Sequence, residues 1–294
     1  MKRKEHVDML GAVALTMFAL HLAFNQVVIK VTNDGFGPIF AAGLRSLCAT
    51  IVVALWIYYR KKQLSLSLDG LKGGTLLGVL FAIEFMCLFT ALDFTSVARV
   101  SIIFYSMPVW LALAAHFLLP AERLTVVRLI GLVVAMAGVA IAVADRSGDA
   151  NLLGDLLALI GAVCWAGIAL TIRLSGLAKA EPAEQLLWQL MVSAPILLVA
   201  AYISGDILRD PQLIHFAGMA FQVIAVASFG FLIWFWLMSV YPASGVASFS
   251  FLSPVFSVLF GWLLLREEVG FSIWIALILV SVGIVLINRK PNKA

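Results

Sequence analysis

The chain has 294 residues, of which 63% are hydrophobic and only 12% are charged, whereas a soluble domain is about half apolar and about a quarter charged. This composition excludes a disordered protein, a disulfide-stapled domain and an ordinary soluble enzyme, and it predicts an all-α membrane protein. The net charge of +4 does not indicate nucleic acid, because the basic residues cluster at the ends of apolar runs.

Ten apolar segments follow one another along the chain, and charged or turn-forming residues separate them. We expect spanning helices at residues 8–30, 36–58, 71–92, 97–119, 124–144, 152–174, 183–204, 214–238, 243–265 and 270–288. At about 20 residues for each span, 294 residues allow about ten helices and the short loops between them. The first segment is too long for the core of a signal peptide and has no small-residue cleavage site after it, so we interpret it as a helix.

The sequence contains few groups that could support chemistry outside the membrane. The three cysteines, Cys48, Cys87 and Cys164, all lie inside apolar segments, and their odd number and spacing fit neither a disulfide framework nor a metal site. The loops are too short for a catalytic domain, and the GxxxxGK[ST] phosphate-binding loop is absent. We therefore expect no enzyme activity, no cofactor, no bound metal and no nucleic-acid partner.

Basic residues are shared unevenly between the two sets of loops. With the amino terminus in the cytoplasm, 14 of the 20 Lys and Arg residues lie at cytoplasmic helix ends. Arg45 lies within the second segment, and five basic residues lie at the outer ends: Lys30, Arg99, Arg146, Arg209 and Arg266. Because positive charge accumulates on the cytoplasmic side, we expect both termini in the cytoplasm.

The second half of the chain repeats the first. Leu10-Gly11 begins the first segment and Leu153-Gly154 begins the sixth, and Pro108 near the end of one half matches Pro254 in the other. Residues 1–145 and 152–290 are therefore expected to form two five-helix repeats. Because five is odd, the second repeat enters the membrane from the opposite face, which is the inverted architecture of many secondary transporters with a central binding cavity.

The motifs near the end of each half resemble those of a known family. They are Val97–Ser101, Pro108-Val109 and Pro120–Thr125 in the first half, and Tyr241–Ser244, Leu252–Val255 and Leu263–Glu268 in the second. These stretches resemble the drug/metabolite transporter superfamily, EamA-type branch. The resemblance implies a multi-pass transporter of the cell inner membrane, and within the family the chain looks most like exporters of amino acids and related metabolites.

Other functions on the same fold stay open at this point. A nucleotide-sugar carrier would need several cavity cations, and a cationic-drug carrier would need an isolated cavity acid. An intramembrane enzyme or a receptor is a rival of a different class, but the sequence has no HExxH zinc motif, no paired catalytic acids and no sizeable loop. The expected partners are the lipid bilayer and a small-molecule substrate, and the chain is expected to be a monomer or a weak homo-oligomer.

Three ionisable residues of the first three apolar segments lie deep within them, where charge is costly and therefore a functional signal. His21, Arg45 and Glu84 each lie about 13 residues from the cytoplasmic end of a helix, so they could form one polar layer. We expect Arg45 to be structural, since it occupies a family position. Glu84 could line the cavity and handle protons, or it could be a neutral buried acid. Phe18, His21 and Asn25 share one helical face and are substrate-contact candidates, although a satisfied core histidine is the plainer reading of His21.

Aromatic residues complete the candidate cavity, because their rings suit an apolar or aromatic substrate. The candidates are Phe81, Tyr105, Trp110, Trp165 and Phe251. For any one of them, simple packing or lipid contact is the alternative. Pro108 and Pro254 each lie about 11 residues into their predicted helices, and because proline breaks the helical hydrogen-bond pattern, we expect a kink at each. The kinks could be hinges for two gates, or static bends that only shape the cavity.

Overall fold

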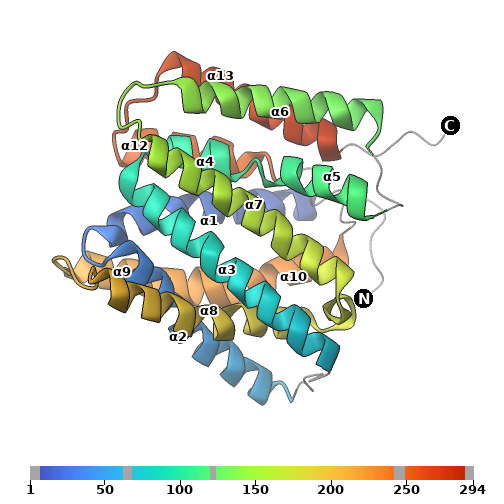
Figure 1. Ribbon diagram of the computed structural model, residues 1–294, viewed down its shortest axis with the longest axis vertical. Helices are drawn as coiled ribbons and strands as arrows, with labels where there is room; N and C mark the ends of the chain where they lie inside the picture. Colours follow the sequence, from blue (N-terminus) through green and yellow to red (C-terminus); the bar gives the residue numbers. More distant parts are fainter. Residues whose placement is uncertain (1–6, 62–67, 120–123, 242–248, 289–294) are drawn as a thin grey trace.

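The computed structural model describes residues 7–61, 68–119, 124–241 and 249–288, and throughout these ranges the chain forms helices and short connections (Figure 1). Among the described residues, nine helical stretches are long and apolar enough to cross a membrane, and Leu252–Leu264 is a shorter apolar helix. The all-α prediction is confirmed. The start of the ninth predicted segment and parts of the family motifs, 120–123 and 242–248, lie outside the described residues.

The helices follow the predicted order. Their bounds are α1 Met9–Asn33, α2 Pro38–Tyr59, α3 Leu68–Phe94, α4 Val97–Phe104, α5 Met107–Leu118, α6 Val126–Ala144, α7 Leu152–Leu174, the short η2 Gly176–Lys179, α8 Pro182–Ser204, α9 Leu213–Phe221, the π-helix η3 Gln222–Gly230, α10 Phe231–Val240, α12 Leu252–Leu264 and α13 Phe271–Asn288.

Polar caps fix where several helices begin. The Asp8 carboxylate accepts a hydrogen bond from the Gly11 amide at the start of α1, at 2.9 Å. Asn151 accepts bonds from the amides of Leu153 and Gly154 at the start of α7. Such caps satisfy amide groups that have no partner within the helix. Because the caps follow each polar loop directly, the apolar runs begin as helices where the sequence predicts them.

The fourth predicted segment is not one continuous helix. The chain turns at Tyr105 and Ser106, so that α4 and α5 are separate, and Pro108 lies in the first turn of α5. Pro254 likewise lies in the first turn of α12, after a turn that includes Phe251. Proline is tolerated in the first helical turn because its missing N–H has no partner there anyway. In the described structure, both prolines therefore begin a helix rather than kink the middle of one.

Each half packs mainly against the other. The most extensive contacts are those of α6 with α13, α3 with α7, α2 with α8, α3 with α8, and α1 with α12, and Figure 1 shows α6 and α13 side by side along one edge of the bundle. A side-chain carbon on Gly131 of α6 would come within 2.8 Å of the Gly283 carbonyl oxygen of α13. Only glycine allows this approach. The pairing places the centre of the molecule between the two halves.

Candidate functional site

A cavity of about 470 Å³ occupies the centre of the bundle. Its lining comes from both halves, including α1, α2, α3, α4 and α7, α8, η3, α10 and α12. The lining also includes Leu15 near the start of α1, Arg173 at the end of α7 and Asn288 at the end of α13. These three positions share one end of the bundle, because the helices alternate in direction. The cavity therefore extends from the centre toward that end.

Two buried ionisable side chains, one basic and one acidic, line this cavity. Arg45 of α2 is 1% exposed and Glu84 of α3 is 4% exposed. The Arg45 guanidinium carbon lies 3.8 Å from the centroid of the Phe85 ring, which is a cation–π contact. Its Nε and Nη2 atoms have no hydrogen-bond acceptor among the described residues, and no described residue donates a hydrogen bond to the Glu84 carboxylate.

The two charges interact electrostatically but do not form a direct ion pair in the described structure. A third unsatisfied group, the Oδ1 atom of Asn25 on α1, is buried in the same cavity wall. Buried polar groups are normally hydrogen-bonded, since an unpaired one costs free energy. The unmet bonding capacity of Arg45, Glu84 and Asn25 is what a polar ligand could satisfy.

Stacked aromatic rings form the apolar walls. The rings of Phe104 and Trp165 are stacked with centroids 5.0 Å apart, and Tyr105 meets Trp165 edge-on at 5.9 Å. On another side, Phe18 of α1 stacks on Trp234 of α10 at 5.1 Å. A cavity with aromatic walls and a few convergent polar groups is the usual form of a small-molecule site.

Six of the nine predicted cavity residues line the cavity: Phe18, Asn25, Phe81, Glu84, Tyr105 and Trp165. Arg45 and Pro108, which we expected to be structural, line it too, whereas Pro254 is buried outside the lining.

The other three predicted residues point elsewhere. His21 lies 3.0 Å through Nε2 from the carbonyl oxygen of Ala225 in η3. Trp110 donates from Nε1 to the Ser106 hydroxyl at 3.1 Å, and Phe251 packs against the hydrophobic core. The contact with the Ala225 carbonyl of the π-helix η3 holds the His21 ring outside the cavity lining.

Sequence reasoning did not select several polar lining residues. Gln26, Gln189 and Ser253 are neutral polar residues in the cavity wall. Ser101 donates to the Gln26 side-chain oxygen at 3.1 Å. The adjacent polar pair at residues 25 and 26 was the available signal for Gln26.

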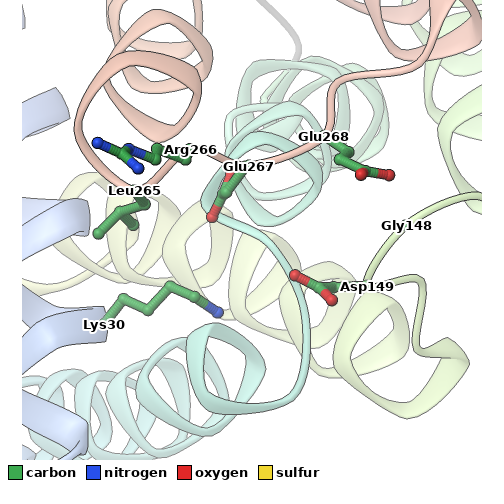
Figure 2. A pocket seen from close by; sticks show the side chains of 7 residues that line it. All are labelled: Lys30, Gly148, Asp149, Leu265, Arg266, Glu267 and Glu268. Carbon is green, nitrogen blue, oxygen red and sulfur yellow. The ribbon is translucent and has the colours of Figure 1, made fainter.

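A second, polar hollow of about 470 Å³ lies among the helix ends away from the cavity mouth. We call it the outer chamber, and Figure 2 shows its lining: Lys30, Gly148, Asp149, Leu265, Arg266, Glu267 and Glu268. Glu267 is 6% exposed, and its two carboxylate oxygens accept hydrogen bonds from the amides of Val97 at 2.6 Å and Ala98 at 3.0 Å. Burial raises the pKa of this carboxyl group above its ordinary value, although the two amide bonds lower it.

Further polar ties gather at the same end. Arg99 of α4 donates two hydrogen bonds to the Asp155 carboxylate of α7, at 2.6 and 3.2 Å, and both side chains are buried. Arg209, in the loop before α9, bonds both oxygens of Asp93 and the carboxylate of Asp206. These acceptors raise the pKa of Arg209 and keep it charged. Across the described ranges, no group of three or more His, Cys, Asp or Glu residues could hold a metal ion.

The sequence is similar to known transporters over nearly its whole length. The profile of the EamA-like transporter family matches twice, over residues 9–144 and 152–289. The uncharacterized transporter YoaV of Bacillus subtilis (strain 168) is 26% identical over 282 residues, with 94% of each chain covered. The uncharacterized inner membrane transporter YedA of Escherichia coli (strain K12) is 24% identical over 317 residues, with 100% of this chain and 97% of YedA covered. A solved crystal structure of a protein shares the fold, with a TM-score of 0.67 at 17% identity over 93% of this chain and 95% of that chain.

Proposed function

Because the chain belongs to the EamA-like transporter family, we propose that this multi-pass membrane transporter exports amino acids with aromatic or apolar side chains, or closely related small metabolites. Transport would proceed by alternating access around the central cavity. The observation that carries the proposal is the pair of buried side chains, basic Arg45 and acidic Glu84, which line an aromatic cavity without bonding each other, with two Arg45 nitrogen atoms left without an acceptor among the described residues.

The charge pair matches the two charged groups of an amino acid. Arg45 could donate to a carboxylate through Nε and Nη2, the two atoms that have no acceptor among the described residues. Glu84 could accept from an ammonium group, and Asn25 could accept a further hydrogen bond through Oδ1. A zwitterion would satisfy all three groups without leaving net charge in the cavity. A ligand with only one charge would leave Arg45 or Glu84 uncompensated.

The aromatic walls favour a ligand whose remaining surface is apolar. Phe18, Phe81, Phe104, Trp165 and Trp234 all line the cavity. Ring contacts add favourable stacking energy to the burial of apolar area. Aromatic and large aliphatic amino acids combine such a side chain with a zwitterionic end that Arg45, Glu84 and Asn25 could bind.

We further propose that the protein lies in the cell inner membrane with both termini in the cytoplasm. The unequal distribution of basic residues over the loops supports this orientation. The cavity would then open toward the cytoplasm, because Leu15, Arg173 and Asn288 line its mouth. Reporter fusions near Lys4 and Lys293 should both report the cytoplasm, and a periplasmic signal at either end would exclude the orientation.

Alternating access requires joints in the helices, and we propose Pro108 and Pro254 for this role. Each proline lies in the first turn of a helix that follows a turn in the chain. Pro108→Ala should slow transport while leaving ligand affinity nearly unchanged, if bending at the Tyr105–Ser106 turn limits the rate. Full transport rates in both Pro108→Ala and Pro254→Ala would show that the prolines only shape the cavity.

The function is tested with purified protein in liposomes. We expect accumulation of labelled phenylalanine, tryptophan or leucine that depends on the protein and is lost in Glu84→Gln. Nucleotide sugars and cationic dyes belong in the same panel, because carriers of these substrates share the fold. Transport of one of these classes with no amino-acid transport would replace the proposal by that alternative.

A further inference from the structure

A row of residues that are either small or polar runs from the central cavity to the outer chamber. On each of three helices they recur every four residues, so they lie on one face of each helix. We call this row the seam, and it consists of Gln26 and Lys30 on α1, Ser101 on α4 with Tyr105 directly after the end of α4, and Ser253, Ser257 and Gly261 on α12.

Contacts at its two ends fix the course of the seam. Gln26, Tyr105 and Ser253 line the central cavity, whereas Lys30 lines the outer chamber. Between them the seam is closed, since Ser101 donates to Gln26 at 3.1 Å and is fully buried. The three helices that carry the seam also pack on one another, α12 against both α1 and α4.

The middle of the seam is polar without an evident structural need. The Ser257 side chain is fully buried, and its hydroxyl has no hydrogen-bond partner among the described residues. An unpaired hydroxyl in a membrane-embedded core costs free energy. If the seam opens and fills with water, a water molecule can bond the Ser257 hydroxyl. If the seam only packs the helices together, the hydroxyl has no partner.

The seam is held shut at its outer end by bonds between two groups of helices. Glu267, three residues after α12, accepts from the first two amides of α4. The Lys30 ammonium group on α1 donates to the carbonyl oxygens of Leu92 at 3.0 Å and Thr95 at 2.8 Å, beside the α3–α4 connection. These bonds cross from the side of α1 and α12 to the side of α3 and α4. The route cannot open while they remain.

On its other side, α4 is joined to α7 by a stronger contact. The buried Arg99–Asp155 pair joins α4 to α7, and breaking such a pair inside the membrane would leave two uncompensated charges. The bonds to Glu267 end on backbone amides, which water can solvate once the route opens. Separation is therefore easier between α4 and α12 than between α4 and α7.

We propose that the substrate leaves the cavity through the seam between α1, α4 and α12, and that Glu267 is a positioning residue that keeps this route closed by holding α4 against α12. The proposal rests on the proposed function only for the identity of the solute. It is tested without any solute, so its failure and the failure of the amino-acid assignment are distinguishable.

The test uses a thiol reporter inside the seam. Ser257→Cys is introduced into a chain in which Cys48, Cys87 and Cys164 are replaced by alanine, and the purified protein reacts with a charged methanethiosulfonate reagent. Glu267→Ala removes the cap on α4, and Glu268→Ala is the matched control, since Glu268 is an exposed acid in the same loop. We expect the reporter to react about fivefold faster or more with Glu267→Ala, the effect of losing a helix cap, and at the unaltered rate with Glu268→Ala.

A second variant disrupts the Glu267 cap from α12. A side-chain carbon on Gly261 would collide with the Glu267 carboxylate, so Gly261→Ala should also release the cap and speed the reaction. It serves if Glu267→Ala does not yield folded protein, as judged by size-exclusion chromatography. Equal reporter rates in Gly261→Ala, Glu267→Ala and Glu268→Ala would overturn the role of Glu267. A reporter that already reacts rapidly in the otherwise unaltered chain would overturn the closed seam.

Discussion

Replacing Glu84 by Gln separates a ligand-binding acid from a structural one. The side chain is 4% exposed, lines the cavity and receives no hydrogen bond from described residues. The amide keeps its size but removes the charge that would bind an ammonium group. A hydrogen bond to a charged group contributes about 1.5–3 kcal/mol, which corresponds to a loss of about 10- to 150-fold in affinity. We expect a loss in this range for phenylalanine.

The assay compares three ligands of the same shape by calorimetric titration of purified protein. Phenylalanine carries both charges, 2-phenylethylamine carries only the ammonium group, and 3-phenylpropionate carries only the carboxylate. Glu84→Gln should weaken the first two ligands and leave or improve the third. Glu184→Gln is the matched control, because Glu184 of α8 is also buried but does not line the cavity. Unchanged phenylalanine affinity in Glu84→Gln would exclude Glu84 as a ligand-binding acid.

Charge removal at three other positions has distinct expected outcomes. Arg45→Gln should weaken phenylalanine and 3-phenylpropionate by about tenfold or more and spare 2-phenylethylamine; equal losses for all three ligands would indicate a structural role. Asp155→Asn should lower the free energy of unfolding by about 3–5 kcal/mol, because it leaves buried Arg99 without its charge partner, and unaltered stability in a denaturation series would contradict this. Among the charged groups of the outer chamber, which include Lys30 and Asp149, Glu267 has its pKa raised by burial, so opening of the seam, which exposes this carboxyl group to water, should lower that pKa toward its ordinary value. Raising the pH above the ordinary carboxyl pKa of 4.5 should therefore favour opening. The readout is the reaction rate of the Ser257→Cys thiol in the chain that keeps Glu267, divided by its rate in the chain with Glu267→Gln. This ratio should rise with pH, and a constant ratio would exclude the linkage.

The sequence is most informative about polar residues that would be costly to expose to lipid. His21, Arg45 and Glu84 are ionisable residues within apolar runs, and the cost of leaving such groups in hydrocarbon is enough to select them as candidates for a shared polar layer. Arg45 and Glu84 line the cavity, whereas His21 does not. The helix order follows from the same hydrophobic pattern, because each run of about 20 apolar residues has to be a helix in lipid.

Departures from the regular α-helix limit the prediction. The shared face of Phe18, His21 and Asn25 predicts three cavity residues, but the π-helix η3 presents the Ala225 carbonyl to His21 and removes it from the cavity. The break between α4 and α5 places Pro108 in the first turn of a helix, whereas the sequence predicts it about 11 residues into one.

Contacts distant in sequence cannot be predicted from spacing. Glu267 caps a helix 170 residues earlier in the chain, and nothing local in the Arg266–Glu268 loop distinguishes the buried acid from its exposed neighbour. The same holds for Arg99 and Asp155, which the helix packing brings together. Such pairs depend on how the two halves dock, which a single sequence does not specify.

The central claim is that Arg45 and Glu84 together bind a zwitterion that then crosses the membrane. A counterflow assay measures both steps at once. Proteoliposomes are loaded with unlabelled phenylalanine, and the uptake of external labelled phenylalanine is followed. We predict rapid exchange with the unaltered protein, strong inhibition by external tryptophan or leucine, weaker inhibition by 2-phenylethylamine, and loss of exchange in Arg45→Gln and in Glu84→Gln. Exchange that persists in both variants, or its absence from the unaltered protein while a nucleotide sugar or a cationic dye exchanges, would show that this pair does not bind a transported amino acid.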